Sequence, residues 1–307
     1  MIQEPMDITT AFPVRRSASQ RSAFREAVGE YARNLGYTVC VEENKKGCHN
    51  LIIGDAAAAK YLVTAHYDTP ARSPFPNFYT PNNLFLYFSY QMLLVLAYMA
   101  VAGIVCLPFW LVSHDSFITF LAWYIAYMVL VFSGRFGPAN KNNWNDNTSG
   151  VVTLLETART MPQNRRSKVA FILFDQEEKG LVGSKAYRNA HKAQTEGQTI
   201  LNLDCVGDGD EIRIFPTKKL KEDAAAMAWL STVCGANGAK NIALKEKGIS
   251  FYPSDQKNFP HAVAIAAFQK KRFVGLYHGR IHTGRDTVLD RTNVNILRAA
   301  LTTLICQ

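Results

Sequence analysis

The feature that most constrains the fold is a long stretch without charged residues in the middle of the chain. No Asp, Glu, Lys or Arg occurs in 73–113 or in 116–134, and only His114 and Asp115 separate the two runs. The apolar segments 84–112 and 117–133 rise by about 1.5 Å per residue, so each could cover most or all of a hydrocarbon core of about 30 Å. The sequence therefore predicts an apolar helical hairpin over 84–133.

The charge-free run predicts that the hairpin contacts a lipid bilayer, because a run of this length is unusual for a helix buried in a soluble protein. An apolar lid or a dimer face is the alternative in water. Both arms of a hairpin return to the same side, so the segments before and after it can fold together. We therefore expect one domain over 1–307, interrupted by the hairpin at 84–133.

Charges beside the hairpin indicate its orientation. Arg72, Arg135 and Lys141 flank it on the domain side, whereas the turn carries Asp115. The positive-inside rule then predicts that the domain lies in the cytoplasm. The first ten residues contain no apolar run of the kind found in secretory signals, so no signal peptide is expected.

Outside the hairpin, short apolar runs alternate with helical patterns. We expect strands at 37–41, 50–53, 61–64, 169–174, 200–203, 212–215, 262–268 and 273–277, and helices at 17–35, 150–160, 184–193, 222–234 and 292–306. This alternation predicts an α/β fold with a mixed, mostly parallel central sheet sandwiched by helices. In such sheets, ligand sites gather at the carboxyl ends of the strands.

The net charge of +9 does not by itself identify a partner. The basic residues form short clusters that are scattered along the chain, as expected for a solvated surface. The charge is also consistent with attraction to an anionic leaflet. We expect no nucleic-acid partner, and no oligomeric state follows from the sequence.

Two segments pair a histidine with a nearby carboxylate. His66 follows the strand expected at 61–64 and precedes Asp68, and His282 precedes Asp286. Imidazole is a common zinc ligand, and a carboxylate beside it can accept the second ring N–H. Each pair alone is more often an ordinary loop contact than a metal site.

Three further segments place carboxylates where the chain leaves a strand or enters a helix. These carboxylates belong to Asp146, Glu177, Glu178 and Asp204. Asp146 alone could simply form a turn before the next helix. The neighbouring Glu177 and Glu178 repel each other unless a cation or a proton separates their roles, so a metal ligand beside a general base is a natural solution.

Together these segments supply two histidines, three carboxylate ligands and one spare glutamate. Two tetrahedral zinc ions about 3.5–4 Å apart need this number of ligands if one carboxylate bridges them and water fills the open position. The sequence therefore predicts a two-metal hydrolytic site.

The residues of these motifs and their order along the chain resemble those of the zinc-dependent aminopeptidase family with co-catalytic metals, of the aminopeptidase Y/S type. The matching segments read HYD from His66, NDNTSG around Asp146, EEKGLVGS from Glu177, NLDCVG around Asp204 and HTGRDT from His282. They occur in the family's order and cover the chain apart from the hairpin. The resemblance implies a mixed, largely parallel sheet between helices, two zinc ions per chain and peptide substrates.

The resemblance also implies how the metal ligands are divided. Asp146 would bridge the two ions. His66 and Asp204 would complete one metal site, and Glu178 and His282 would complete the other.

The same resemblance implies the roles of the remaining acids. Glu177 would take a proton from the bridging water and return it to the leaving amine. Asp68 and Asp286 would orient the two histidines, and Asp68 is therefore counted with Glu177 among the catalytic residues.

Substrate-binding residues are less well defined by the pattern. Family members often have a tyrosine that polarises the scissile carbonyl, and Tyr252 and Asp255 only approximately match that segment. His278 lies four positions before His282 and could line the pocket. The hairpin itself is not part of the usual family core, which leaves substrate selectivity open.

Three functions remain for this sequence. The first is a membrane-associated zinc aminopeptidase that removes N-terminal residues from peptides. The second is an aminoacyltransferase of the glutaminyl cyclase type, which resembles the same fold and uses one zinc. The third is a non-catalytic, membrane-tethered peptide-binding module. The complete ligand set and the GLVGS segment favour the peptidase.

Overall fold

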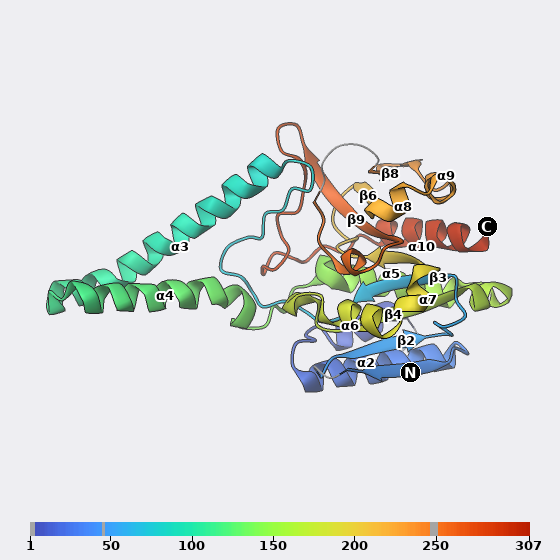
Figure 1. Cartoon of the computed structure of the whole chain (residues 1–307), viewed down its shortest axis with the longest axis horizontal. Coiled ribbons are helices and arrows are strands. Elements are labelled where there is room, and N and C mark those ends of the chain that lie inside the picture. Colours follow the sequence, from blue (N-terminus) through green and yellow to red (C-terminus); the bar gives the residue numbers. More distant parts are fainter. Residues whose placement is uncertain (1–3, 45–46, 246–250) are drawn as a thin grey trace.

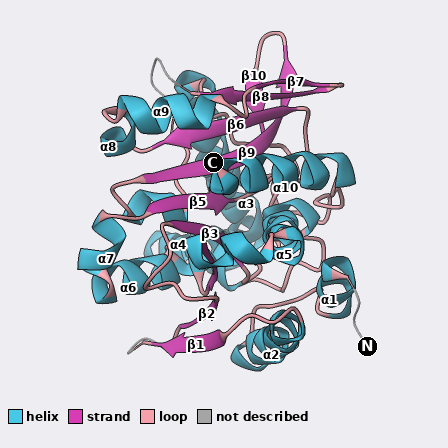
Figure 2. Ribbon diagram, turned by 90° about the vertical axis from the view of Figure 1, so that its right-hand side faces the viewer, coloured by secondary structure: helices cyan, strands magenta, loops and turns pink. Residues whose placement is uncertain are grey.

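The protein is built around a ten-stranded sheet with helices on both faces (Figure 2). The computed structural model describes residues 4–44, 47–245 and 251–307. The strands lie in the order β1-β2-β4-β3-β5-β9-β6-β8-β7, and β10 pairs with β9. Their bounds are β1 Val39–Glu43, β2 His49–Ile53, β3 Tyr61–His66, β4 Val169–Phe174, β5 Thr199–Leu203, β6 Glu211–Pro216, β7 Gly235–Asn237, β8 Lys240–Leu244, β9 Ala262–Lys271 and β10 Gly275–Tyr277.

The centre of the sheet is parallel and its edges are largely antiparallel. β4, β3, β5 and β9 form the parallel centre, whereas β1, β2, β7 and β10 pair antiparallel with their neighbours. The expected mixed α/β sheet is thus confirmed. His66 pairs in register with Phe174, so β3 and β4 end at the same edge.

Helices cover both faces of this sheet. In Figure 2, α1, α2, α5 and α10 lie on one side, and α6 and α7 lie on the other. The helix bounds are α1 Pro5–Ala11, α2 Ala18–Asn34, α3 Leu84–Ser113, α4 Ser116–Phe136, α5 Gly150–Thr160, α6 Val182–Ala190, α7 Lys192–Glu196, α8 Lys218–Lys221, α9 Ala224–Ser231 and α10 Arg291–Cys306. Ser17 begins α2 with a capping box, because its side chain accepts the Gln20 N–H and Gln20 bonds back to Ser17.

The central strands are buried on both faces, which explains their continuous apolar runs. In β4, Phe171 and Leu173 belong to the core cluster that includes residues of α2, α5 and α10. Ile172 and Phe174 point the opposite way and pack in a cluster with Tyr187 of α6. Successive side chains of one strand point to opposite faces of the sheet, so β4 contributes apolar side chains to both hydrophobic cores.

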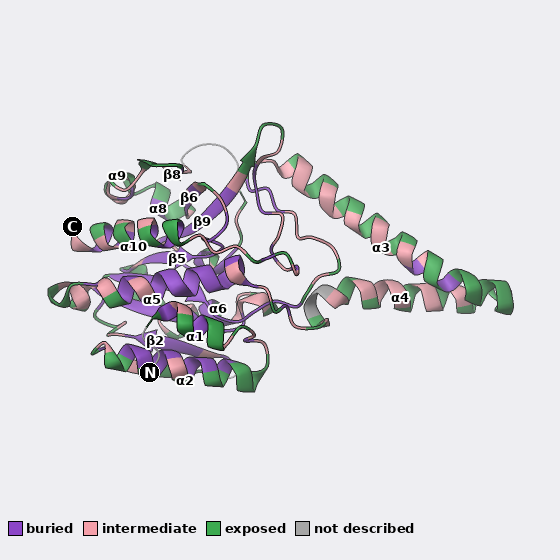
Figure 3. Ribbon diagram, turned by 180° about the vertical axis from the view of Figure 1, so that it is seen from behind, coloured by how far each residue is buried: buried purple, intermediate pink, exposed green. Residues whose placement is uncertain are grey.

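The helices α3 and α4 project from the domain as a pair (Figure 1). Their most apolar windows have mean hydropathies of 2.4 and 1.8, and only 11% and 0% of those windows are buried. By length and composition, both helices could cross a membrane. Most of their surface is exposed or only partly buried (Figure 3). The expected helical hairpin is present, and its apolar side chains are covered by little else in the described chain.

The turn between these helices is short and well capped. His114 ends α3 in the left-handed region, with φ of 52°. Asp115 then begins α4, and its Oδ1 accepts the N–H groups of Phe117 and Ile118. Further along the pair, the Trp123 ring N–H donates to the carbonyl oxygen of Met99, in the middle of α3, at 3.1 Å, which ties the two helices together.

The two feet of the hairpin meet at the domain surface. Ala71 and Ala139 form an isolated antiparallel bridge. Beside it, the Arg72 N–H donates to Pro138 O at 2.8 Å and the Asn140 N–H donates to Pro70 O at 3.1 Å. The side chain of Arg135, one of the charges used to predict orientation, lies outside the described part of the structure.

Candidate metal centre

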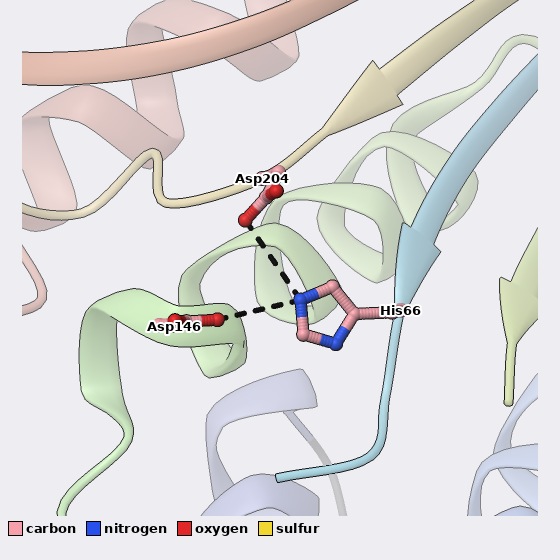
Figure 4. A group of neighbouring side chains, drawn as sticks. All are labelled: His66, Asp146 and Asp204. Carbon is pink, nitrogen blue, oxygen red and sulfur yellow. Dashed lines mark ion pairs between the residues drawn. The ribbon is translucent and has the colours of Figure 1, made fainter. Parts of the chain in front are cut away.

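The ends of two central strands and the segment before α5 bring the first predicted ligands together (Figure 4). His66 is the last residue of β3, Asp204 follows β5, and Asp146 precedes α5. The His66 Nε2 atom lies 3.3 Å from Asp146 Oδ1 and 3.8 Å from Asp204 Oδ1. All three residues are buried.

A second group forms around the same aspartate. The His282 Nε2 atom lies 3.0 Å from Asp146 Oδ2 and 3.5 Å from Glu178 Oε2. Within each group, the possible ligand atoms lie no more than 4.8 Å apart. Asp146 therefore directs one carboxylate oxygen toward each histidine, and the two groups share it.

The backbone around Asp146 is fixed by neighbouring carboxylate and amide groups. Asp286 accepts the N–H groups of Asn145 at 2.8 Å and of Asp146 at 3.0 Å. The Asn145 side-chain oxygen in turn accepts the N–H groups of Gly207 and Asp208. We expected Asp286 to orient His282, but in the described structure its oxygens are directed to the Asp146 backbone. These two hydrogen bonds hold the backbone that carries the shared carboxylate.

Asp68 connects the first histidine to the pair of glutamates. Its carboxylate accepts the N–H of Glu177 at 2.9 Å and the N–H of Glu178 at 3.2 Å. The His66 Nδ1 atom lies 3.2 Å from the backbone oxygen of Asp68 and 3.5 Å from its carboxylate. Asp68 thus positions the backbone of both glutamates as well as the His66 ring.

Asn147 joins the segment after Asp146 to the end of β5. Its amide donates to Leu203 O at 2.9 Å, and its side-chain oxygen accepts the N–H groups of Gly150 and Cys205. A Cβ atom at Gly150 would lie 2.4 Å from the Asn147 Oδ1 and 2.7 Å from Leu203 O. The glycine of the NDNTSG segment is therefore needed so that α5 can approach the strand.

The electrostatics of the site reflect several buried acids close together. Burial raises the pKa of Glu177 well above its ordinary value, and it raises the pKa of Glu178 to about 8. Burial opposes ionisation of Asp146 too, but hydrogen bonds from His282 and His66 outweigh it and lower the pKa of Asp146. Burial works against charge on His282, yet Glu178 and Asp146 raise its pKa to about 10.

These residues fit a metal centre. The Glu178 Oε1 atom is buried and, among the described residues, has no hydrogen-bond partner. Imidazole nitrogens and carboxylate oxygens are the donors that zinc accepts. The converging carboxylates repel one another, and burial makes their negative charges more costly. A cation between them would offset both effects. Two histidines with three surrounding carboxylates could therefore hold zinc.

A cavity of about 200 Å³ opens beside both groups. Tyr252 and His278, two predicted substrate-binding residues, line it together with the ligand residues and Glu177. The Tyr252 hydroxyl donates to the backbone oxygen of Asp204 at 3.1 Å. Asp255 is completely buried outside this lining and accepts a 2.5 Å hydrogen bond from the Ser184 hydroxyl, and burial raises its pKa to about 7. The structure does not place Asp255 in the cavity wall.

Several residues of the site have no motif in the sequence that identifies them. Tyr79 and Tyr87 line the cavity, although both belong to the charge-free stretch that we interpreted only as a hairpin and its approach. Arg15 is completely buried and donates to the Tyr67 backbone and to Thr148, on the loops that carry Asp68 and Asp146. Burial lowers the pKa of Arg15 to about 10. It is therefore not part of the solvated basic surface that we expected.

An α/β sheet that brings two histidine–carboxylate groups together at its strand ends has the ligand chemistry of a metal-dependent enzyme. The chain belongs to peptidase family M28, whose model matches residues 135–304, more than half of the sequence. Family membership implies zinc as the metal. The match begins after the hairpin, so His66 and Asp68 lie before it. A search of curated proteins by sequence returned no match.

Solved structures share the fold over almost the whole chain. The glutaminyl cyclase of Porphyromonas gingivalis is 16% identical, with a TM-score of 0.60, over 98% of this chain and 95% of that one. The glutaminyl cyclase of Fimbriiglobus ruber is 17% identical, with a TM-score of 0.60, over 98% and 93%. The aminopeptidase LapA of Legionella pneumophila is 14% identical, with a TM-score of 0.58, over 98% and 70%. At these identities the likeness concerns the fold.

Proposed function

We propose that this protein is a membrane-associated zinc aminopeptidase that holds two ions and hydrolyses N-terminal residues from peptides. His66 and Asp204 would hold one ion, Glu178 and His282 would hold the other, and Asp146 would bridge them. The observation that carries the proposal is the position of Asp146, whose two oxygens face His66 and His282 separately at 3.3 and 3.0 Å. A carboxylate placed in this way suits a pair of co-catalytic metals.

When bound, the ions would polarise the scissile carbonyl and lower the pKa of a coordinated water. Glu177 lines the cavity beside both ligand groups and is not needed as a ligand in this assignment. Its carboxylate can take a proton from the attacking water and return it to the leaving amine. Burial raises its pKa, which favours the proton-carrying state between these two transfers.

The size of the cavity supports action at a chain terminus. Its volume of about 200 Å³ is below the roughly 300–1,000 Å³ of typical small-molecule clefts. Tyr252, His278 and Ile281 line it together with the two glutamates. A space of this size suits the first residue of a peptide better than a chain that passes through.

In the same proposal, residues 1–307 form one exopeptidase domain interrupted by the hairpin at 84–133. The hairpin would anchor the domain to a bilayer, because few of its apolar side chains are covered by the described chain. Arg72 and Lys141 at its feet favour a cytoplasmic location of the domain. The partners would be a peptide substrate and lipid.

A glutaminyl cyclase activity is the second candidate. Two cyclases match this structure over nearly their whole length, whereas LapA is matched over 70% of its chain. That activity would use a single zinc and would cyclise an N-terminal glutamine without removing a residue. The number of bound ions and the product therefore separate the two candidates.

The test uses the full-length protein in detergent, loaded with zinc and freed of excess metal. Zinc per chain is measured by mass spectrometry, and the products are measured for peptides that begin with free leucine, acetylated leucine or glutamine. The aminopeptidase proposal expects two zinc ions and release of free leucine from the unblocked peptide alone. One zinc with pyroglutamate formation supports the cyclase, and equal cleavage of the acetylated peptide contradicts exopeptidase action. Two zinc ions without turnover of any peptide would favour a binding module.

A further inference from the structure

The first turn of α3 forms part of the catalytic cavity. Tyr87, the fourth residue of this helix, lines the same space as His66, Asp146 and Glu177. Its ring meets that of Tyr79 edge-on, with centroids 5.4 Å apart, and Tyr79 meets Tyr252 in the same way at 5.7 Å. The hairpin is therefore joined to the site by a chain of aromatic contacts.

This aromatic wall is anchored to the sheet on its domain side. Tyr79 and His278 exchange backbone hydrogen bonds of 3.0 and 2.8 Å. The His278 ring contacts that of Phe268 of β9 at a tilt, with centroids 4.3 Å apart. Tyr79 and Phe268 belong to one buried cluster against which Tyr87 packs. The first turn of α3, which we call its root, consequently has a fixed position relative to the metal ligands.

On its outer side, the same wall continues into exposed apolar surface. Phe88 is 62% exposed and Phe85 is 84% exposed, both in the first turns of α3. Phe251 contacts Tyr87 at 6.3 Å and is itself 41% exposed. An apolar surface of this kind around a polar cavity indicates an apolar environment at the cavity entrance.

The length of α3 fixes how far the cavity lies from the hydrocarbon. About 20 residues span the hydrocarbon core, so counting back from Ser113 at the hairpin turn places its near boundary close to Leu94. Tyr87 lies seven residues before Leu94, which corresponds to about 10 Å along the helix. Each headgroup layer is about 5–8 Å deep, so this distance places Tyr87 at or just beyond its outer edge. Tyr90, between them, bonds Pro76 O at 2.5 Å and so holds the approach to α3 at this level.

The turn between β9 and β10 lies on the same side of the domain as the root of α3 (Figure 1). Tyr277 of β10 contacts Phe78, in the segment that leads to α3, at 5.7 Å. Lys270, Lys271 and Arg272 are exposed near this turn, and Phe273 is 87% exposed. Basic residues beside an exposed aromatic side chain suit a surface of anionic headgroups.

We propose that the catalytic cavity opens at the lipid–water interface, that its preferred substrates are peptides whose amino termini are held close to the bilayer surface, and that Tyr87 determines specificity for the first residue. This inference rests on the proposed aminopeptidase function and on the membrane position of the hairpin. It assigns the hairpin a second role, since the helix that anchors the protein also shapes the pocket.

A molecular ruler tests the position of the cavity. Full-length protein is reconstituted in vesicles of phosphatidylcholine and phosphatidylserine. The substrates are peptides with one N-terminal sequence and a C-terminal acyl anchor, separated by a Gly/Ser spacer of about 3 or about 15 residues, which reach about 10 and about 50 Å when extended. A peptide without an anchor serves as the soluble reference.

The short-spacer peptide should be hydrolysed at least as fast as the long-spacer peptide, and both should be hydrolysed at least tenfold faster than the soluble one. Tenfold slower hydrolysis of the short-spacer peptide would place the cavity far from the bilayer and overturn the inference. Equal rates for all three peptides would remove the preference for membrane-held substrates. If none of the three peptides is cleaved, the aminopeptidase function itself fails.

A pair of tyrosine variants tests the specificity role. Tyr87→Ala should lower the ratio of kcat/KM for N-terminal phenylalanine over N-terminal alanine about tenfold, because it removes an aromatic wall of the pocket. Tyr98→Ala is the matched control, since Tyr98 belongs to the same helix and contacts Phe75 outside the cavity. Tyr87→Phe should retain the wild-type ratio. An unchanged ratio in Tyr87→Ala, with both variants folded and zinc-loaded, would overturn this role.

Discussion

The central strands and the hairpin helices have similar apolar side chains and opposite surroundings. Phe171 of β4 is completely buried between the sheet and the helices on one of its faces, whereas Phe120 of α4 is 61% exposed. Hydrophobicity alone does not distinguish these two environments. The number of consecutive apolar residues does distinguish them, because a buried strand needs only about six and a membrane helix needs about 20. The comparison teaches that the apolar strands are covered by the protein itself, whereas the apolar helices are left for a second solvent, which we propose to be lipid.

The largest expected effect concerns the hairpin alone. If residues 95–131 are replaced by a short Gly/Ser link, the protein should move from the membrane pellet to the soluble fraction on ultracentrifugation. The root of α3, including Tyr87, is kept in this variant. Zinc content should stay at the wild-type value, because no ligand is removed. Continued pelleting of a folded, monodisperse variant would show that lipid is not the solvent of the hairpin.

The next largest effect concerns the metal centre alone. Glu177→Gln should reduce kcat about 100- to 10,000-fold while zinc content and membrane binding remain unchanged, since a positioned general base contributes about that much. Glu196→Gln is the control, because Glu196 is exposed and its carboxylate pairs with Arg188 and Lys219, which are not metal ligands. Loss of zinc from the Glu177 variant would instead assign this residue to the ligands.

A matched pair of substitutions compares the two apolar regions directly. Phe171→Ala should lower the free energy of unfolding by about 3–5 kcal/mol, because it leaves a cavity in the sheet core. Phe120→Ala should change it by less than about 0.5 kcal/mol in detergent, as expected for an exposed position. Thermal and denaturant unfolding of both purified variants would measure this difference. Equal destabilisation would mean that α4 packs against protein.

The smallest effect concerns a buried histidine in the core. Burial lowers the pKa of His278 to about 4, whereas an unfolded histidine titrates near about 6.5. The unfolded chain therefore takes up a proton first as the pH falls, and stability is lost between about pH 6.5 and pH 4. The loss amounts to about 3 kcal/mol by linkage.

His278→Gln should remove this part of the acid sensitivity, which is seen as a shallower fall of unfolding free energy over the same pH window. His114→Gln is the control in the hairpin turn, where the side chain is exposed in the folded chain. If both variants keep the wild-type pH dependence, protonation of His278 does not contribute to acid unfolding.

Much of the sheet could be predicted because its strands are short apolar runs between polar turns. The strand at 169–174 and the helix at 150–160 have the expected bounds, and most other elements are displaced by only one or two residues. The edge strand β7 and its neighbour β8 are not predicted by the sequence. β7 contains Gly235, Ala236 and Asn237, all exposed, so it carries no apolar alternation for a pattern to detect.

The site could be predicted in part for a similar reason. His66, Asp146, Glu178, Asp204 and His282 stand at strand ends or loop junctions, and the structure brings all five together. The aromatic wall could not be predicted, because Tyr79 and Tyr87 are brought to the cavity by the path of the chain between β3 and α3. The interaction of Asp286 with the Asp146 backbone likewise depends on tertiary geometry, since 140 positions separate the two residues.

The bridge between Ala71 and Ala139 bears on how an insertion at this point can evolve. Backbone hydrogen bonds join the two ends of the inserted segment, so about 67 residues lie in a loop whose ends meet. The entropic cost of closing such a loop rises only slowly with its length. An inserted segment such as this apolar hairpin can therefore be gained or exchanged at this junction in one genetic event while the surrounding sheet is retained. The same junction offers protein engineers a place to fuse a different anchor or a reporter domain beyond the first turns of α3.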